Sequence, residues 1–243
     1  NRADWYNGYD DRKALLALDV SFGWSEYVYG KINLPYKIKI YDQYDDVFSQ
    51  NIFKPNSGES YQRRMPFDAG ISVGNSFFNF YLGRGQLNMG SGFSGNLFVA
   101  DNFQYQDFAK LSFYDDFFSY DLTYTHFDQE KKWTGGINSL EEEMSFDGKH
   151  QSRITHSYTF DIADKVSLSL REGAILQTQT ALDLRMFNPF MFLHNWNGFS
   201  SAAGYWANNI MGLEVTAALG LGLRMDFQFV LDQFQLPNEA ASS

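Results

Sequence analysis

Apolar and polar residues alternate with a period of two along much of the chain. Phe118, Tyr120 and Leu122 alternate with polar residues such as Ser119 and Thr123. Successive side chains of a β-strand point to opposite faces, so this pattern places apolar groups on one face and polar groups on the other. Similar runs occur at residues 32–40, 154–160, 166–170 and 221–229. The pattern predicts an all-β protein of roughly ten to twelve strands, each about 9–11 residues long, as a tilted strand needs to cross a bilayer.

Short turns and long polar loops alternate between these predicted strands. The short turns are Asp115-Asp116 and residues 161–164, and the long loops are residues 44–64, 129–150 and 195–209. Short turns at one end of the strands and long loops at the other are typical of bacterial outer-membrane barrels. A soluble barrel or sandwich would show the same alternation, with the apolar face turned to a core. The pattern alone leaves both architectures open.

Composition excludes some classes of function but does not decide between the possible folds. Aromatic residues make up 18% of the chain, and they favour both strands and membrane interfaces. The formal net charge of −10 argues against a nucleic-acid partner, which would need a basic surface. Cysteine is absent, which excludes disulfides and thiolate metal sites. The uncharged stretches 85–100 and 186–213 do not predict membrane helices, because the second contains Pro and several Asn residues that are costly in hydrocarbon.

Signatures of catalysis mostly fail in the sequence. No H-E-x-x-H or P-loop motif occurs. His150 and His156 would share one face of a strand but lie far apart along it, without a third ligand. Adjacent acidic residues such as Asp45-Asp46 favour a solvated surface over a catalytic pair, whose members must converge on one bond. We therefore predict no enzyme, no cofactor and no metal site.

Two charged residues lie in sequence contexts where a charged side chain needs a specific partner or contact with water. Glu172 interrupts the apolar stretch 168–176, so it faces a wet lumen or pairs with a cation such as Arg171 or Arg185. Arg84 precedes a glycine-rich passage at the end of a predicted strand. It either binds a carboxylate or sugar hydroxyls, or pins the loop by pairing with Asp101.

Three passages in order resemble the Wzi-like capsule-assembly family of bacterial outer-membrane proteins. The first comprises Gly83, Arg84, Gly90, Gly92, Ser94, Asn96, Leu97, Asp101 and Asn102. The second runs from the strand 165–176 with Glu172 through residues 183–189, which include Arg185, Asn188 and Pro189. The third joins residues 208–213 to the predicted strand that ends at 230–234 and includes Asp232. The resemblance covers roughly residues 15–234.

The resemblance implies an outer-membrane barrel that binds capsular or exported polysaccharide at the cell surface and anchors it without catalysis. The expected partners are the polysaccharide and outer-membrane lipid, and no oligomeric state is predicted. Residues 1–243 are expected to form one antiparallel transmembrane β-barrel domain. It is expected to be an incomplete portion of a larger barrel, because the family's barrel continues through further strands after the position of Phe234. The family also tends to carry Trp where this chain has Met89.

The expected polysaccharide contacts combine the glycine-rich passage with loop tryptophans, whose rings stack on sugar faces. They are Arg84, Asp101, Asn102, Trp133, Trp196 and Trp206. An alternative places the tryptophans in an interfacial aromatic belt. The residues expected to be polar groups of the lumen or the framework are Glu172, Arg185, Asn188 and Asp232.

Other functions compete with the anchoring role. A diffusion channel is the main alternative, with inward polar residues such as Lys37, Arg171 and Arg224 along a water-filled lumen. A soluble secreted barrel with a small ligand is a further possibility, and a loop hydrolase acting on polysaccharide has the least support.

Overall fold

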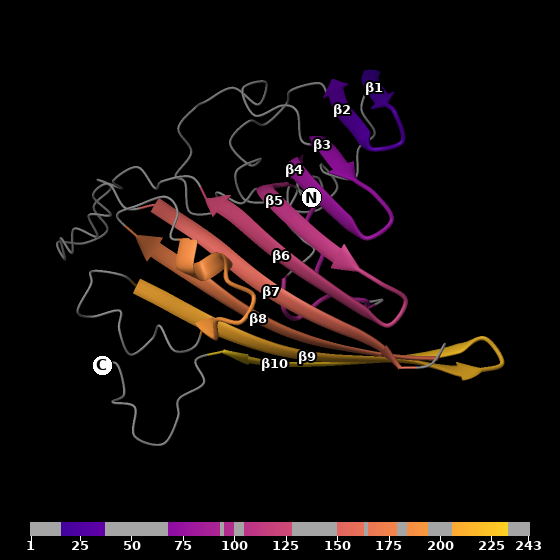
Figure 1. Ribbon diagram of the computed structural model, residues 1–243, viewed down its shortest axis with the longest axis vertical. Coiled ribbons are helices and arrows are strands. Elements are labelled where there is room, and N and C mark those ends of the chain that lie inside the picture. Colours follow the sequence, from indigo (N-terminus) through magenta and orange to yellow (C-terminus); the bar gives the residue numbers. More distant parts are fainter. Residues whose placement is uncertain are drawn as a thin grey trace, which may run out of the picture.

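Ten antiparallel strands form one sheet, in which every strand pairs with its neighbours in sequence (Figure 1). The computed structural model describes residues 16–36, 68–92, 95–99, 105–127, 150–162, 165–178, 184–193 and 206–232. The strands are β1 (Leu16–Trp24), β2 (Val28–Tyr36), β3 (Asp68–Gly74), β4 (Phe78–Gly85), β5 (Gln106–Tyr114), β6 (Phe118–Phe127), β7 (His150–Ile162), β8 (Val166–Thr178), β9 (Trp206–Gly220) and β10 (Leu223–Asp232). One short 3-10 helix, η4 (Leu184–Phe187), follows β8. Among the described residues, no helix has the length and apolar character needed to cross a membrane.

Tight turns join the strands at one end of the sheet, and longer connections follow the even-numbered strands at the other. The Asp115-Asp116 turn lies where the sequence predicts it, and the Asp115 amide donates to the Phe118 carbonyl at 2.8 Å. Leu221 and Gly222 join β9 to β10 with φ values of 54° and 78°. Two successive positive φ angles give a two-residue turn whose twist matches that of the flanking strands. The predicted 195–209 loop is wrong at its end, because β9 already begins at Trp206.

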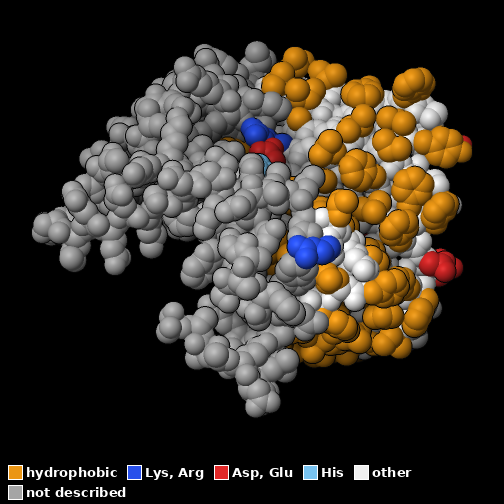
Figure 2. Space-filling view, turned by 60° about the vertical axis from the view of Figure 1, so that its left-hand side comes forward, with side chains coloured by type: hydrophobic (Ala, Val, Ile, Leu, Met, Phe, Trp, Pro, Cys, Tyr) orange, Lys and Arg blue, Asp and Glu red, His pale blue; other side chains and the backbone are white. Residues whose placement is uncertain are grey.

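The pairing register sorts side chains onto two chemically different faces that continue across all ten strands. On β10, Met225, Phe227 and Phe229 share one face, and Asp226 and Gln228 share the other. Leu18, Val20 and Phe22 of β1 belong to the first face, which we call the apolar face. Hydrophobic side chains cover much of the sheet surface, with few charged groups among them (Figure 2). The predicted alternation is therefore confirmed at the level of the sheet.

The all-β, antiparallel architecture is confirmed, whereas the closure of the sheet into a barrel stays a prediction. In the described part of the chain, β1 pairs only with β2 and β10 only with β9. These two strands lie at opposite edges of the sheet (Figure 1).

Two segments outside the strands pack against the two faces. Residues 86–92 and 95–99, here the polar-face segment, pack through Leu87, Met89, Phe98 and Val99. Residues 184–193, here the apolar-face segment, pack through Met186 and Leu193 onto the opposite side of β6–β8. In Figure 1, η4 lies in front of β7 and β8. The two small cores thus lie on opposite sides of one sheet.

Candidate functional site

The polar-face segment leaves the end of β4 and crosses the sheet to reach β9 and β10. Met89 and Val99 form an antiparallel bridge within it. Phe98 packs over Gly212 of β9, where a Cβ would come within 2.7 Å of its ring, and over Gly173 of β8, where the distance would be 3.0 Å. A glycine inside a strand often marks a close approach of another group, and here the two glycines make room for one aromatic ring.

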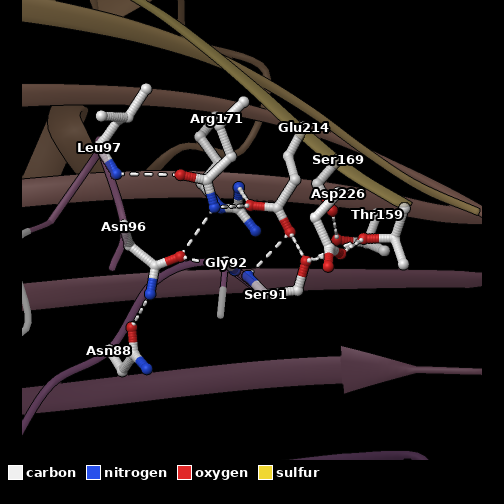
Figure 3. Close-up of polar contacts among 12 residues, drawn as sticks. Asn88, Ser91, Gly92, Asn96, Leu97, Thr159, Ser169, Arg171, Glu214 and Asp226 are labelled. Carbon is white, nitrogen blue, oxygen red and sulfur yellow. Dashed lines mark hydrogen bonds and ion pairs between the residues drawn. The ribbon is translucent and has the colours of Figure 1, made fainter. Parts of the chain in front are cut away.

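Ser91 is the point where the segment is tied to the strands (Figure 3). Its amide donates to Glu214 Oε1 at 3.0 Å, and its hydroxyl oxygen lies 2.5 Å from the same atom. The hydroxyl is also 2.8 Å from Thr216 Oγ1 and 3.1 Å from Asp226 Oδ1. Ser91 therefore contacts residues of both β9 and β10.

Asn96 and Gln228 make a second attachment. Gln228 Nε2 donates to Asn96 Oδ1 at 2.7 Å, and the Leu97 amide donates to Gln228 Oε1 at 3.0 Å. Asn96 also accepts from the Gly92 amide at 3.1 Å and donates to Asn88 Oδ1. The Gln228 side chain of β10 thus holds the segment through the side chain of Asn96 and through the backbone amide of Leu97.

The charges around this attachment balance one another. Arg171 Nη1 lies 2.8 Å from Glu214 Oε2, and the two side chains are only 11% and 6% exposed. Arg224 Nη2 lies 2.8 Å from Asp226 Oδ1 and also donates to the Ser91 carbonyl at 3.2 Å. Because two guanidinium groups neutralise two carboxylates, the cluster suits the holding of a segment better than the binding of an ion. Among the described residues, no three His, Cys, Asp or Glu side chains gather as metal ligands would.

The rest of the polar face carries hydroxyls and paired charges. Lys110 Nζ lies 3.1 Å from Asp121 Oδ1, and Thr159 Oγ1 lies 2.8 Å from Ser169 Oγ. Arg153 is buried and donates to Gln106 Oε1 at 3.0 Å. Its Nε and the Gln106 Nε2 have no hydrogen-bond partner in the structure. This face therefore offers donors and acceptors of the kind that sugar hydroxyls and water require.

Arg84 binds a carboxylate within the described part of the chain. Its Nε and Nη2 bind the Asp107 carboxylate at 2.6 and 2.8 Å, and its guanidinium carbon lies 4.6 Å from the centre of the Tyr105 ring. The predicted partner Asp101 lies outside the described residues, as do Asn102, Trp133 and Trp196. Trp206 opens β9, but its side chain is not among those described. Because two nitrogens of Arg84 bind the Asp107 carboxylate, this pair holds the start of β5 against the end of β4.

Glu172, Arg185 and Asn188 lie on the apolar-face side, not on the polar face. Glu172 pairs in register with His156 and is 8% exposed beneath the apolar-face segment. Arg171, one of its two predicted partners, points to the opposite face and binds Glu214. Arg185 is exposed in η4, and Asp232 ends β10 on the polar face. The register therefore places the Glu172 side chain on the face of the sheet opposite to Arg171.

His156 explains why polar side chains lie under the apolar-face segment. Its Nε2 lies 2.9 Å from the Met186 carbonyl and its Nδ1 lies 2.8 Å from the Tyr120 hydroxyl. A carbonyl can only accept, so Nε2 carries the proton and Nδ1 accepts from Tyr120. Nε2 therefore attaches the segment, and the hydrogen bond from Tyr120 of β6 fixes the orientation of the ring.

Sequence reasoning missed the attachment residues Ser91, Glu214 and Gln228. Ser91 lies 123 residues before Glu214 in the chain and still further from Gln228, and none of the three belongs to a local motif. The sequence contained one signal that a group packs closely against these strands, namely Gly173 and Gly212, two glycines inside otherwise regular strand patterns.

Comparison of the chain with protein-family models, with curated proteins and with solved structures found no match.

Proposed function

We propose that the chain forms the wall of an outer-membrane β-barrel that binds capsular or exported polysaccharide and anchors it at the cell surface without catalysis. The observation that carries this proposal is the segregation of an exposed apolar face from a polar face across ten antiparallel strands. In the proposed barrel the apolar face contacts lipid and the polar face lines the lumen.

Exposure of large side chains on the apolar face supports the membrane part of the proposal. Phe22, Phe227 and Leu223 are 55%, 51% and 62% exposed. Soluble monomers rarely leave a continuous apolar surface of more than a few hundred Å² uncovered. Trp24, Phe77 and Phe117 are exposed near the tight turns, where an aromatic girdle would meet the membrane interface.

The polar-face segment supports an anchoring barrel over an open channel. It contains Gly90, Asn96 and Leu97, which belong to the first passage that resembles the capsule-assembly family. Its contacts with β9 and β10 support a position across the proposed lumen. A lumen that is crossed by a tightly held segment favours retention of a surface ligand over free diffusion of solutes.

The distribution of polysaccharide between cells and medium tests this function. Deletion of the gene is expected to leave synthesis intact and to shift the polymer from the cell-bound to the released fraction, and reintroduction of the gene should reverse the shift. The Trp133→Ala/Trp196→Ala/Trp206→Ala variant should reproduce the release while still folding. An unchanged distribution in the deletion strain would contradict the anchoring role, and normal retention by the folded triple variant would contradict only these contacts.

A diffusion channel is the second candidate, and the polar lining of the sheet favours it. Ser, Thr and paired charges such as Lys110 and Asp121 suit a water-filled pore. The purified full-length protein in a planar bilayer separates the two. Steady conductance would support the channel, whereas the anchoring proposal predicts little conductance.

A further inference from the structure

We propose that the apolar-face segment is a membrane contact, which inserts Leu184, Phe190 and Phe192 into the boundary between the headgroups and acyl chains of the adjacent leaflet. This inference rests on the proposed placement of the sheet in a membrane. It adds a lipid-binding element outside the strands, which neither the alternation nor the turns predict.

The segment has one buried side and one exposed apolar side. Met186 and Leu193 are 2% and 0% exposed against the sheet, whereas Leu184, Phe190 and Phe192 are 81%, 87% and 67% exposed. Three large apolar side chains within ten residues point away from the protein although the same segment buries others. Such a division suits an element that lies at an interface, with one side on protein and the other in lipid.

A turn within the segment directs Phe190 outward. The Asn188 side-chain oxygen accepts from the Phe190 amide at 3.0 Å, and the Met191 amide donates to the Asn188 carbonyl at 3.0 Å. Pro189 stands between them and restricts the backbone. Asn188, an expected lumen or framework residue, therefore shapes the exposed turn of this segment.

Side chains from three strands hold the segment in place. His156 of β7 binds the Met186 carbonyl at 2.9 Å, and Asn209 of β9 donates to the Leu193 carbonyl at 3.0 Å. Tyr158 of β7 donates to the Pro189 carbonyl. Tyr124 of β6 packs its ring 5.9 Å from that of Phe187. Because carbonyls buried in lipid need partners, these side chains allow a non-helical segment to lie against a lipid-exposed wall.

The segment borders the uncovered part of the apolar face. Leu170 of β8 is 44% exposed, whereas Ala174 and Leu176, further along the same face of the strand, are buried under the segment. Toward the long connections this face becomes polar, as the Arg84–Asp107 pair shows. The segment therefore lies where the apolar band meets the polar end, the level at which headgroups begin if the band spans the acyl layer.

Lipid fits this surface better than a second protein. The exposed groups are three side chains on a narrow segment that continues a much larger apolar face. A stable protein interface needs about 800 Å² from each partner, with a polar rim around a packed core. Acyl chains need neither shape complementarity nor a rim.

Depth-dependent fluorescence quenching tests the proposal, and the absence of native cysteine makes single labels simple. The Phe190→Cys variant is labelled with bimane and reconstituted into phosphatidylcholine vesicles that carry a nitroxide near the headgroup or near the end of the acyl chain. We expect quenching by the shallow nitroxide and weaker quenching by the deep one. Phe192→Cys serves as a second reporter if the first variant folds poorly.

Two matched reporters separate this inference from the membrane proposal on which it rests. Phe227→Cys on the apolar face of β10 should be quenched most by the deep nitroxide, and Leu97→Cys, exposed on the polar-face segment, should not be quenched. Quenching at residue 227 without quenching at residues 190 and 192 would overturn the lipid contact alone. No quenching at any of the reporters would overturn the membrane placement as well.

Discussion

At the residue scale, the Arg171–Glu214 pair is the most buried ion pair among those described and the one on which the polar-face segment depends. Glu214 accepts from Arg171, Ser91 and Gln228 at once. Removal of its only cationic partner in this cluster would leave a carboxylate that is 6% exposed with neutral donors alone. Buried charges are costly unless they are paired as well as hydrogen-bonded.

We therefore expect Arg171→Met to lower the free energy of unfolding by about 3–5 kcal/mol. Urea titration of the detergent-refolded protein measures the loss. Lys110→Met is the matched control, because the Lys110–Asp121 pair lies on the same face with side chains that are 37% and 32% exposed. It should cost less than about 1 kcal/mol. Equal losses in the two variants would contradict the importance of the buried pair.

Gly212 gives a second prediction at this scale. A Cβ at this position would lie 2.7 Å from the Phe98 ring, so the ring must shift in Gly212→Ala. We expect a loss of about 1–3 kcal/mol from overpacking in the same titration. Gly23→Ala is the control, since a Cβ there would meet nothing closer than 3.9 Å. Tolerance of Gly212→Ala at the level of the control would mean that Phe98 does not pack as described.

At the scale of elements, the strands could be predicted from sequence and the two packed segments could not. Period-two runs such as residues 118–124 and 221–229 identify faces because the pleat alone fixes where each side chain points. The polar-face segment depends instead on contacts such as Ser91 with Glu214, which join residues 123 positions apart. The same limitation explains Glu172, whose charge suggested a lumen until the register and the overlying segment placed it on the apolar side.

A designed disulfide tests whether the polar-face segment lies across β9. The Ser91 and Thr216 hydroxyl oxygens are 2.8 Å apart, so Ser91→Cys/Thr216→Cys should cross-link under mild oxidation without loss of fold. Gel mobility with and without reductant measures the cross-link. Ser91→Cys/Ser21→Cys, with Ser21 on β1 at the far edge of the sheet, should remain unlinked. Equal cross-linking of both pairs would show that the segment is not held at β9.

At the scale of the whole molecule, the two faces of the sheet decide what the protein can do. The described strands supply an apolar face, a polar face and a segment that crosses the polar face. The proposed anchoring role requires that lipid cover the apolar face. A soluble sandwich would need a second layer over this face.

A charge on the apolar face should therefore disturb folding into vesicles more than a charge on the polar face. We expect Phe227→Arg to cost about 2–4 kcal/mol if residue 227 lies near the middle of the bilayer. Ser21→Arg, at an exposed position on the polar face of β1 and outside the attachment of the polar-face segment, changes the charge by the same amount and should cost less. Folding efficiency in vesicles over a urea series measures both. A larger loss at residue 21 would reverse the assignment of the faces.

The most direct test of the central claim is a nitroxide scan along β10, residues 224–231, in lipid vesicles. Collisional access to oxygen, which concentrates in lipid, is compared with access to a water-soluble nickel complex at each position. We predict a period of two, with oxygen favoured at Met225, Phe227, Phe229 and Leu231 and disfavoured at the residues between them. Access to the nickel complex at these four positions, or a profile without alternation, would contradict the placement of the apolar face in lipid.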